Sequence, residues 1–409
     1  MHRSPHERRA RTRRRDAAAR IAYHGLPLDL GDHRGTAAGP GPDGEATLRL
    51  HTPQGTRVYV DPYAQPSVPR RYVYGTWTSP MMGPGFAFRD LVATWHGQTP
   101  DGSWIEVSAR ARSATSGVWC GWLVLARWAD DDGDVHPTSV PEEANEIASI
   151  ATDTLRAATG ADAWQLRVTL LRPESSGGTG PVLTYAGAMV SAGSGQRSRP
   201  GDPGPAAGRV LEVPPLSQRV HRGHYPQWGG GGEGWCSPTS TAMVLAFWGT
   251  GPDAGATAWV DPSYPDPSVC HAVRYCYDHA YGGTGNWSFN TAYAARFGLR
   301  TFVTRLRDLV EAETFVAAGI PLVASIVVDP DRLAGADYRS DGHLAVVCGF
   351  TPGGDVVVND PAAQDPSTVR RVYRRADFER AWSRGSDRLV YVMHPPAVAL
   401  PVPPPEANW

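Results

Sequence analysis

The stretch Gly234-Trp235-Cys236-Ser237-Pro238-Thr239-Ser240-Thr241 puts a cysteine where a helix is expected to begin. Pro238 suits the first turn of a helix, because the N–H that proline lacks has no partner there. Residues 242–248 have the apolar composition of a buried helix, and Gly249 ends it. The free N–H groups and the dipole at a helix N-terminus favour a thiolate. We therefore predict that Cys236 is a nucleophile and not an inert buried thiol, which is the commoner fate of an unpaired cysteine.

A thiolate nucleophile needs a base, and the base needs a group that orients it. Downstream, Asp341-Gly342-His343 begins an apolar strand, and a Gly-rich turn leads to a second strand that ends in Asn359-Asp360-Pro361. We predict His343 as the base and Asp360 as the orienting acid. A simple hairpin places Asp360 nearer Val347 than His343, and a bulge near Gly349 would bring the acid and the base together.

A cysteine at a helix start, a downstream Gly-His before an apolar strand and then Asn-Asp-Pro together resemble the bacterial cysteine peptidases related to the bacteriocin-processing, double-glycine leader peptidases. The resemblance spans about residues 213–394. It implies a papain-like fold in which Cys236 is the nucleophile, His343 the base and Asp360 the orienting residue. In that family a glutamine upstream of the cysteine helps to form the oxyanion hole. That role falls to Gln218, which follows an apolar-Pro segment, with Gln227 as second choice.

Two further stretches bear on this resemblance. The family often has Cys-Gly-Pro where this chain has Cys236-Ser237-Pro238. The segment Gly285–Tyr293 is similar to an actinobacterial-type, two-domain variant of the same family. The fold class that we predict is therefore α+β, with an all-β domain in front of a papain-like peptidase domain.

Composition divides the 409 residues into five parts. Short runs rich in β-branched and aromatic residues, separated by turn signals, predict a β-sandwich-like domain in the first half. One short helix is expected within it, at residues 141–157. The predicted parts are a disordered Arg/Gly/Pro-rich arm (1–45), the β-sandwich-like domain (46–190), a linker (191–210), the papain-like cysteine peptidase domain (211–396) and a Pro-rich tail (397–409).

Composition also excludes several functions and compartments. The chain contains no lysine, which rules out Schiff-base, P-loop and Ser-Lys chemistry. The net charge of −2 gives no reason to expect nucleic acid or an anionic membrane as a partner. No apolar run reaches the length of about 18 residues that a membrane span needs. The Arg-rich first 20 residues lack the apolar core of a signal peptide. We therefore expect a cytoplasmic protein, or an extracellular one if the start is assigned wrongly.

A metal site is the main alternative use of the cysteines and histidines. Five cysteines leave at least one thiol without a partner in the chain. Cys270 and Cys276 are close enough in sequence for a disulfide or a metal pair, together with His271 and His279, and His221 and His224 form a second candidate pair. None of these has the paired spacing that is usual for zinc, so no metal site and no cofactor are predicted.

The predicted reaction is the hydrolysis of a peptide or protein substrate through a thioester on Cys236. Three alternatives remain open. The same triad performs amide or acyl transfer when an amine replaces water. In the second alternative, the chain is a binding protein that uses the peptidase fold as a scaffold without catalysis. The seven Trp of the first domain alternatively form a platform that binds glycan or cell wall, although Trp in strands more often belongs to a core.

Overall fold

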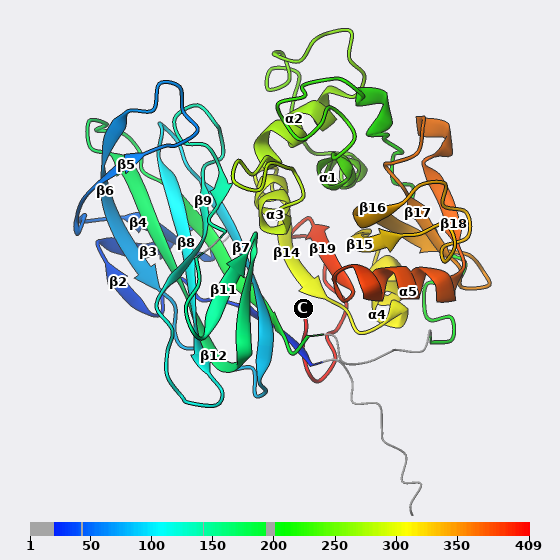
Figure 1. The fold of residues 1–409 in the computed structure, drawn as a ribbon, viewed down its shortest axis with the longest axis horizontal. Helices are drawn as coiled ribbons and strands as arrows, with labels where there is room; N and C mark the ends of the chain where they lie inside the picture. The colour runs from blue at the N-terminus through cyan, green and yellow to red at the C-terminus, as the bar shows by residue number, and fades with distance from the viewer. Residues whose placement is uncertain (1–19, 42–43, 142, 194–200) are drawn as a thin grey trace, which may run out of the picture.

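The computed structural model describes residues 20–41, 44–141, 143–193 and 201–409 (Figure 1). Up to Ser191 every described element is a strand, and the chain then changes to a region of helices and sheet. In Figure 1 the two regions lie side by side. The strands of the first region, all antiparallel, are β1 (Ile21–Gly25), β2 (Asp32–Arg34), β3 (Thr36–Pro40), β4 (Ala46–Leu50), β5 (Gly55–Val60), β6 (Pro69–Thr78), β7 (Phe88–Gln98), β8 (Trp104–Ser113), β9 (Leu123–Trp128), β10 (Thr138–Ser139), β11 (Ala148–Ala151), β12 (Thr154–Pro173) and β13 (Val182–Ser191).

The strand β12 organises this first region. It is 20 residues long and has a register irregularity between residues 156 and 163, so that its two halves pair with different neighbours. The first half pairs with β7 and β11, and the second half pairs with β8 and β6. Buried Trp164, Leu166 and Val168 alternate with the half-buried Gln165 and Arg167 in the second half. This alternation matches the period of a strand that covers a core with one face.

Two sequence expectations for this region are wrong. The helix expected at residues 141–157 is replaced by β11 and the start of β12, because the alternately buried run Ala148–Ala151 pairs edge to edge with β12. The arm expected to be disordered to residue 45 carries β1, β2 and β3. Ile21, Leu26 and Leu28 are buried there, and β1 satisfies its backbone by pairing with β13. Residues 1–19, the start of that arm, lie outside the described residues.

The second region contains a six-stranded antiparallel sheet in the order β14-β19-β15-β16-β17-β18. Three helices, α1 to α3, lie on one side of the sheet, and α4 and α5 lie on the other (Figure 1). The elements are η2 (Arg219–His221), α1 (Cys236–Phe247), α2 (Pro267–Cys276), α3 (Trp287–Ala295), β14 (Arg300–Arg305), α4 (Leu309–Ala317), β15 (Leu322–Val328), β16 (Ser340–Phe350), β17 (Val356–Asn359), η3 (Pro366–Thr368), β18 (Arg370–Tyr373), α5 (Arg375–Ser386) and β19 (Leu389–His394).

A bulge in the β16–β17 hairpin decides which face Asp360 occupies. Near the turn, Phe350 is in register with Val356, and continuing that register would set Asp360 opposite Val346. The register shifts by one residue between Val347 and Gly349, as the sequence suggested, and Val346 then pairs with Asn359. Asp360 therefore follows opposite Ala345, two residues from His343. Because strand residues two apart share a face, the shift puts Asp360 on the side of His343.

The two regions share buried surface. Helix α3 packs on β7, where the Ser288 hydroxyl donates to the carbonyl oxygen of Ala93 at 2.7 Å. The aromatic ring of Phe289 meets that of Trp95 with centroids 6.2 Å apart. The described end of the predicted linker, residues 201–210, packs on the second sheet through bridges to Gly349 and Phe350. This part of the chain therefore belongs to the second region and is not a free linker.

The tail also belongs to the fold. Asn408 is fully buried, donates to the carbonyl oxygen of Arg305 at 2.8 Å and accepts from Arg307 at 2.7 Å. The Trp409 ring packs against Phe315, with centroids 4.9 Å apart. The backbone N–H of Tyr23, from β1, donates to the carbonyl oxygen of Ala407. The last residues thus touch both regions.

Candidate active site

Cys236 is the first residue of α1, as the sequence predicts. Burial raises the pKa of its thiol, but a hydrogen bond to His343, the charge of His343 and the backbone N–H groups of Leu344 and Ser237 together outweigh burial. The net pKa of Cys236 is therefore lowered. The three other cysteines whose pKa is shifted, Cys270, Cys276 and Cys348, move in the opposite direction because burial is the largest influence on their thiols.

His343 and Asp360 form a buried ion pair. His343 Nε2 lies 2.8 Å from Asp360 Oδ1, and the two residues are 3% and 0% exposed. Because Nε2 faces the carboxylate, the remaining ring nitrogen Nδ1 is the one left for the sulfur of Cys236. Burial lowers the pKa of His343, but Asp360 and Cys236 raise it by charge and hydrogen bonding, and the net pKa is well above the ordinary value. A protonated His343 is the form that stabilises a thiolate.

Side chains that sequence reasoning missed hold the Asp360 carboxylate. The hydroxyl of Tyr338 donates to both carboxylate oxygens, at 3.0 and 2.9 Å, and the hydroxyl of Tyr373 donates to Oδ2 at 3.1 Å. The backbone N–H of Ala362 donates to Oδ1 at 3.0 Å. Burial raises the pKa of Asp360, but His343 and these donors lower it below the ordinary value. Asp360 therefore stays ionised although it is fully buried.

A cleft of about 1000 Å³ opens over Cys236 and His343. Three glycine-containing stretches line it, at residues 229–234, 282–285 and 342, and both regions of the chain contribute to its walls. Three tyrosines, Tyr277, Tyr281 and Tyr338, line it as well. An open cleft with a lowered-pKa thiol beside a charged imidazole can hold an extended chain and attack a carbonyl carbon.

Of the two candidate glutamines, only Gln218 lines this cleft. Its Nε2 donates to the carbonyl oxygen of Glu233 at 2.8 Å, and its backbone N–H donates to Pro361 at 2.8 Å. The side chain is buried, and its Oε1 has no hydrogen-bond partner among the described residues. Gln227, the second choice, is exposed and does not line the cleft. Of the two glutamines, Gln218 is therefore the one that the fold places at the cleft.

The residues of the metal alternative are placed as follows. All five cysteines are free thiols, and Cys270 and Cys276 lie buried on α2. His221 Nδ1 lies 3.4 Å from His224 Nδ1 and 3.6 Å from Cys270 Sγ. Within the described part of the chain, no group of three or more His, Cys, Asp or Glu side chains has a geometry that could hold a metal ion.

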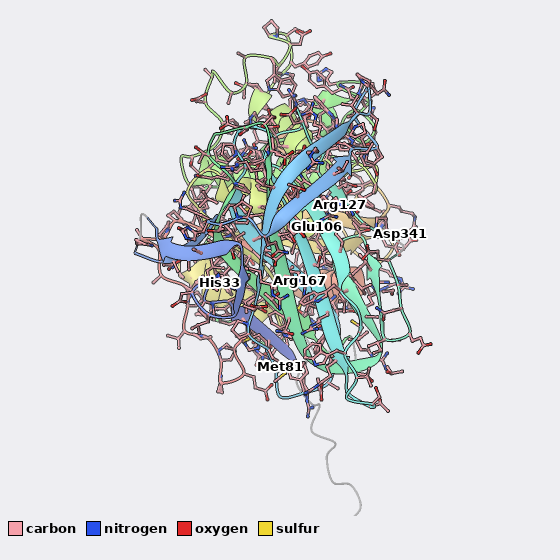
Figure 2. The ribbon with its side chains drawn as sticks, turned by 90° about the vertical axis from the view of Figure 1, so that its left-hand side faces the viewer. His33, Met81, Glu106, Arg127, Arg167 and Asp341 are labelled. Atoms are coloured by element: carbon pink, nitrogen blue, oxygen red, sulfur yellow. The ribbon has the colours of Figure 1, made fainter. Side chains whose placement is uncertain are left out.

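The Trp residues of the first region do not form an open platform. Five of the seven are buried, and the other two are half-buried: Trp77, Trp95, Trp104, Trp128 and Trp164, against Trp119 and Trp122. Arginines stack on the half-buried pair. The Arg110 guanidinium lies 4.7 and 4.6 Å from the two ring centroids, and Arg167 lies 4.0 Å from that of Trp122. Figure 2 shows Arg167 on the outer face of the sheet.

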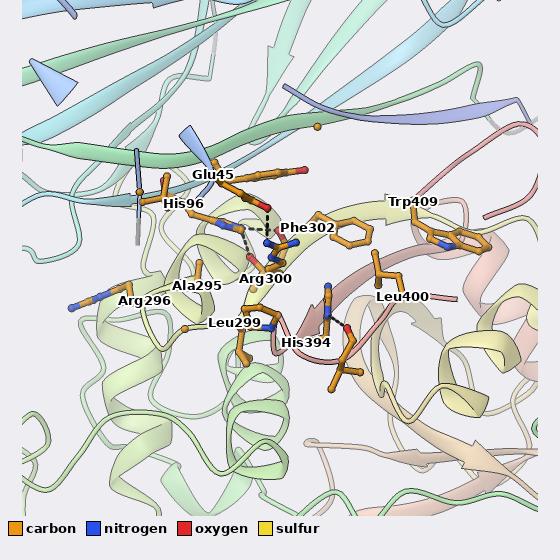
Figure 3. A pocket seen from close by; sticks show the side chains of 18 of the residues that line it. Glu45, His96, Ala295, Arg296, Leu299, Arg300, Phe302, His394, Leu400 and Trp409 are labelled. Carbon is orange, nitrogen blue, oxygen red and sulfur yellow. Dashed lines mark hydrogen bonds and ion pairs between the residues drawn. The ribbon is translucent and has the colours of Figure 1, made fainter. Parts of the chain in front are cut away.

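A second cavity, of about 720 Å³, lies where the two regions meet (Figure 3). Tyr185 stacks on His96 at one wall, and an ion pair joins Arg300 to Glu45 at 2.5 Å. None of its lining residues also lines the cleft over Cys236.

In the part of the chain that the structure describes, no helix combines the length and the apolarity that a membrane span requires.

In the comparison with known proteins, each region matches a family model. Residues 27–191 match the Peptidase C39 N-terminal domain of actinobacterial type, and residues 210–389 match the Peptidase_C39 like family. No curated protein matches the chain. Two solved structures are partly similar. One contains the CBM22-1 and GH10 modules of xylanase 10B from Clostridium thermocellum, in complex with xylohexaose, at 9% identity and a TM-score of 0.22. The other is a family two carbohydrate esterase from Cellvibrio japonicus, at 12% identity and a TM-score of 0.18.

The matches cover 49% and 47% of this chain and only 32% and 43% of those two chains, and neither score indicates a common fold. The family matches, by contrast, follow the two regions of the structure in order. The sequence motifs around Cys236 and His343 resemble this same peptidase family. The chain therefore matches a two-domain variant of the C39 peptidases.

Proposed function

We propose that the chain is a papain-like cysteine peptidase that hydrolyses peptide bonds with the triad Cys236, His343 and Asp360. One observation carries the proposal. The helix-start thiol of Cys236, whose pKa is lowered by His343, lines an open cleft together with His343, and the buried imidazole of His343 lies 2.8 Å from the buried carboxylate of Asp360. The match to the Peptidase_C39 like family supports peptidase chemistry at this site.

In the first step the Cys236 thiolate attacks the carbonyl carbon of the scissile peptide bond. The carbonyl oxygen becomes an oxyanion, which the backbone N–H of Cys236 and the Gln218 amide stabilise. When the tetrahedral intermediate collapses, the C–N bond breaks and His343 gives its proton to the leaving amine. A thioester then joins the acyl part of the substrate to Cys236.

In the second step a water molecule attacks the thioester. His343, now neutral, accepts a proton from the water, and the C–S bond breaks as the acid product leaves. The thiolate and the imidazolium are restored. Asp360 keeps Nδ1 of His343 directed at the sulfur and stabilises the imidazolium in both steps. No cofactor takes part in this scheme.

The proposal is tested with a pool of peptides from a digested proteome, analysed by mass spectrometry for new peptide termini. We expect the wild-type chain and the Cys120→Ala variant to produce the same new termini, because Cys120 is buried in the β region. Cys236→Ala should produce none, because it lacks the nucleophile. Cleavage by Cys236→Ala would contradict the proposal. Products joined to an added amine instead of water would indicate acyl transfer with the same triad.

A further inference from the structure

The first region forms part of the wall of the cleft over Cys236. The turn between β11 and β12 reaches the cleft with residues 151–154, and Arg156 lines it from the start of β12. All four residues of β11 pair with the first four residues of β12, so this wall is a regular hairpin tip and not a loose loop. A substrate in the cleft therefore meets side chains of both regions.

Two carboxylates fix this wall against the catalytic region. Asp153, in the hairpin turn, accepts from the backbone N–H of Trp287 at 2.7 Å, which caps the first turn of α3. In the reverse direction, Asp278 accepts from the backbone N–H of Ser139 at 2.9 Å. Both carboxylates are buried. The hairpin is thus held in a fixed position relative to the cleft, as a specificity element must be.

Among the charged side chains that line the cleft, Arg156 is distinguished by its lack of a partner. Arg219 is paired with Glu233, and Arg339 is paired with Asp329 and Asp331. Asp153 is buried and occupied by Trp287 and Thr154. Arg156 is exposed, and no ion pair or hydrogen bond of its guanidinium is present within the described residues. Among the described residues, it is therefore the arginine of the cleft without a partner for its charge.

The surroundings of Arg156 suit a carboxylate ligand. Asp90, its cross-strand neighbour, is already bound to Arg305 at 2.7 Å and does not neutralise it. Arg305 in turn donates to the carbonyl oxygen of Ser386 at 3.0 Å. The hydroxyls of Ser386 and Ser325 lie 2.8 Å apart, and both serines line the cleft. An exposed planar guanidinium that lines a cleft is a donor that recognises a carboxylate.

We propose that Arg156 is a specificity-determining residue that binds a carboxylate of the peptide substrate, either an Asp or Glu side chain or the terminal carboxylate. The inference rests on the proposed function, because it concerns the substrate of the Cys236 site. It gives the β region a role in choosing substrates. One point charge on a fixed wall selects a charge at one position of the peptide, and leaves the other positions free.

The test uses tetrapeptide acyloxymethyl ketones, with which the Cys236 sulfur forms a thioether as the carboxylate group leaves. Asp, Asn or Lys is placed at each position in turn, and mass spectrometry of the full-length chain gives the rate of labelling at Cys236. At one position we expect the wild type to prefer Asp over Lys by about tenfold, the size of one charge-assisted hydrogen bond. Arg156→Gln should remove the preference, and Arg156→Glu should reverse it.

Arg49→Glu is the matched control, because Arg49 is an exposed arginine of the same region that does not line the cleft. It should keep the wild-type preference. Unchanged labelling by the Asn probes shows that a variant has an intact site. An Asp-to-Lys ratio that is equal in the wild type and in Arg156→Glu overturns the role of Arg156 while the proposed function stands. Absence of labelling at Cys236 in the wild type overturns the proposed function, and this inference with it.

Discussion

At the scale of single residues, the carboxylate of Asp360 sets the charge state of the whole site. It is fully buried, yet two tyrosine hydroxyls and a backbone N–H donate to it in addition to His343. These donors keep its pKa low, so Asp360 is negative over the whole range in which enzymes work. A fixed negative charge at Nε2 favours the protonated imidazole, and the protonated imidazole favours the thiolate of Cys236.

The pH dependence of Cys236 labelling by iodoacetamide should therefore depend on the charges of His343 and Asp360. Since the pKa of Cys236 is lowered, labelling should reach half its maximum below the ordinary thiol value of about 8.5. In Asp360→Asn the negative charge is gone, the imidazolium is less stable, and the thiolate loses its counter-charge. The midpoint should therefore rise by about one pH unit or more. Labelling kinetics between pH 5 and 10 measure it.

Asp365→Asn serves as the control, because Asp365 is an exposed acid that caps the short helix η3 and does not line the cleft. Its midpoint should equal that of the wild type. A midpoint in Asp360→Asn that does not move would contradict the proposed coupling of the three groups.

The sequence was informative about the residues that we propose to react, and it was silent about the side chains that support them. Cys236 and His343 could be predicted because the helix start and the Gly-His before a strand are local patterns. Tyr338 and Tyr373 could not, because each reaches Asp360 from a different segment and nothing local marks either residue. A hydroxyl that binds a buried carboxylate becomes visible only when the strands are placed in register.

At the scale of elements, the bulge of β16 depends on a close approach of two backbones. Gly349, beside the bulge, forms an isolated bridge with Val210 from the segment before the catalytic helix. A Cβ atom at Gly349 would lie 2.6 Å from Cα of Val210 and would collide with the carbonyl oxygen of Arg209. Backbone atoms cannot move aside as a flexible side chain can, so glycine is required at this position.

Gly349→Ala should therefore lower the free energy of unfolding by about 1–3 kcal/mol, the usual cost of overpacking a dense site. Gly353→Ala is the matched control in the same hairpin, because a Cβ there would meet only Oγ1 of Thr351, at 3.9 Å. That variant should stay within about 0.5 kcal/mol of the wild type. Urea unfolding monitored by Trp fluorescence measures both. Equal stability of the two variants would contradict this prediction, because it would show that the backbone of Arg209 and Val210 shifts to accommodate the added methyl group.

Local sequence patterns predicted this hairpin but not every element of the fold. The strands and the need for a bulge were evident from the spacing of His343, Gly349 and Asp360. The helix expected at residues 141–157 was wrong, because pairing of Ala148–Ala151 with β12 overrides helix propensity. The strands at residues 21–40 were missed, because edge strands with few apolar residues are stabilised by the sheet they join.

At the scale of the whole molecule, the two regions do not have separate interiors. Phe289 and Ala292 of α3 belong to the core of the β region, and Ile21, Val92 and Met189 of the β region belong to the core of the catalytic region. Composition indicated a boundary near residue 191, and the family matches agree with two parts. Burial across that boundary depends on which faces meet, and a single sequence does not record it.

The C-terminal tail offers a test of whether contacts between the two regions stabilise the fold. Asn408 is buried and makes side-chain hydrogen bonds to Arg305, Glu311 and Arg307. Asn408→Ala removes all three of these hydrogen bonds and leaves the carbonyl oxygen of Arg305 without the Asn408 donor, so the free energy of unfolding should fall by about 1–3 kcal/mol. Val402→Ala, in the same tail at a position that is 91% exposed, should change it by less than about 0.5 kcal/mol. If both variants unfold like the wild type, the tail contributes no stability.

The paired carboxylates Asp153 and Asp278 have a consequence for how such proteins evolve. Each lies in one region and binds a backbone N–H of the other, so the position of the cleft wall is encoded by both halves of the gene. A recombination event that joined this catalytic half to a foreign β half would keep the triad and lose the wall. Crossovers between the halves should therefore be selected against, and mutations that change substrate preference should accumulate on both sides of the junction together.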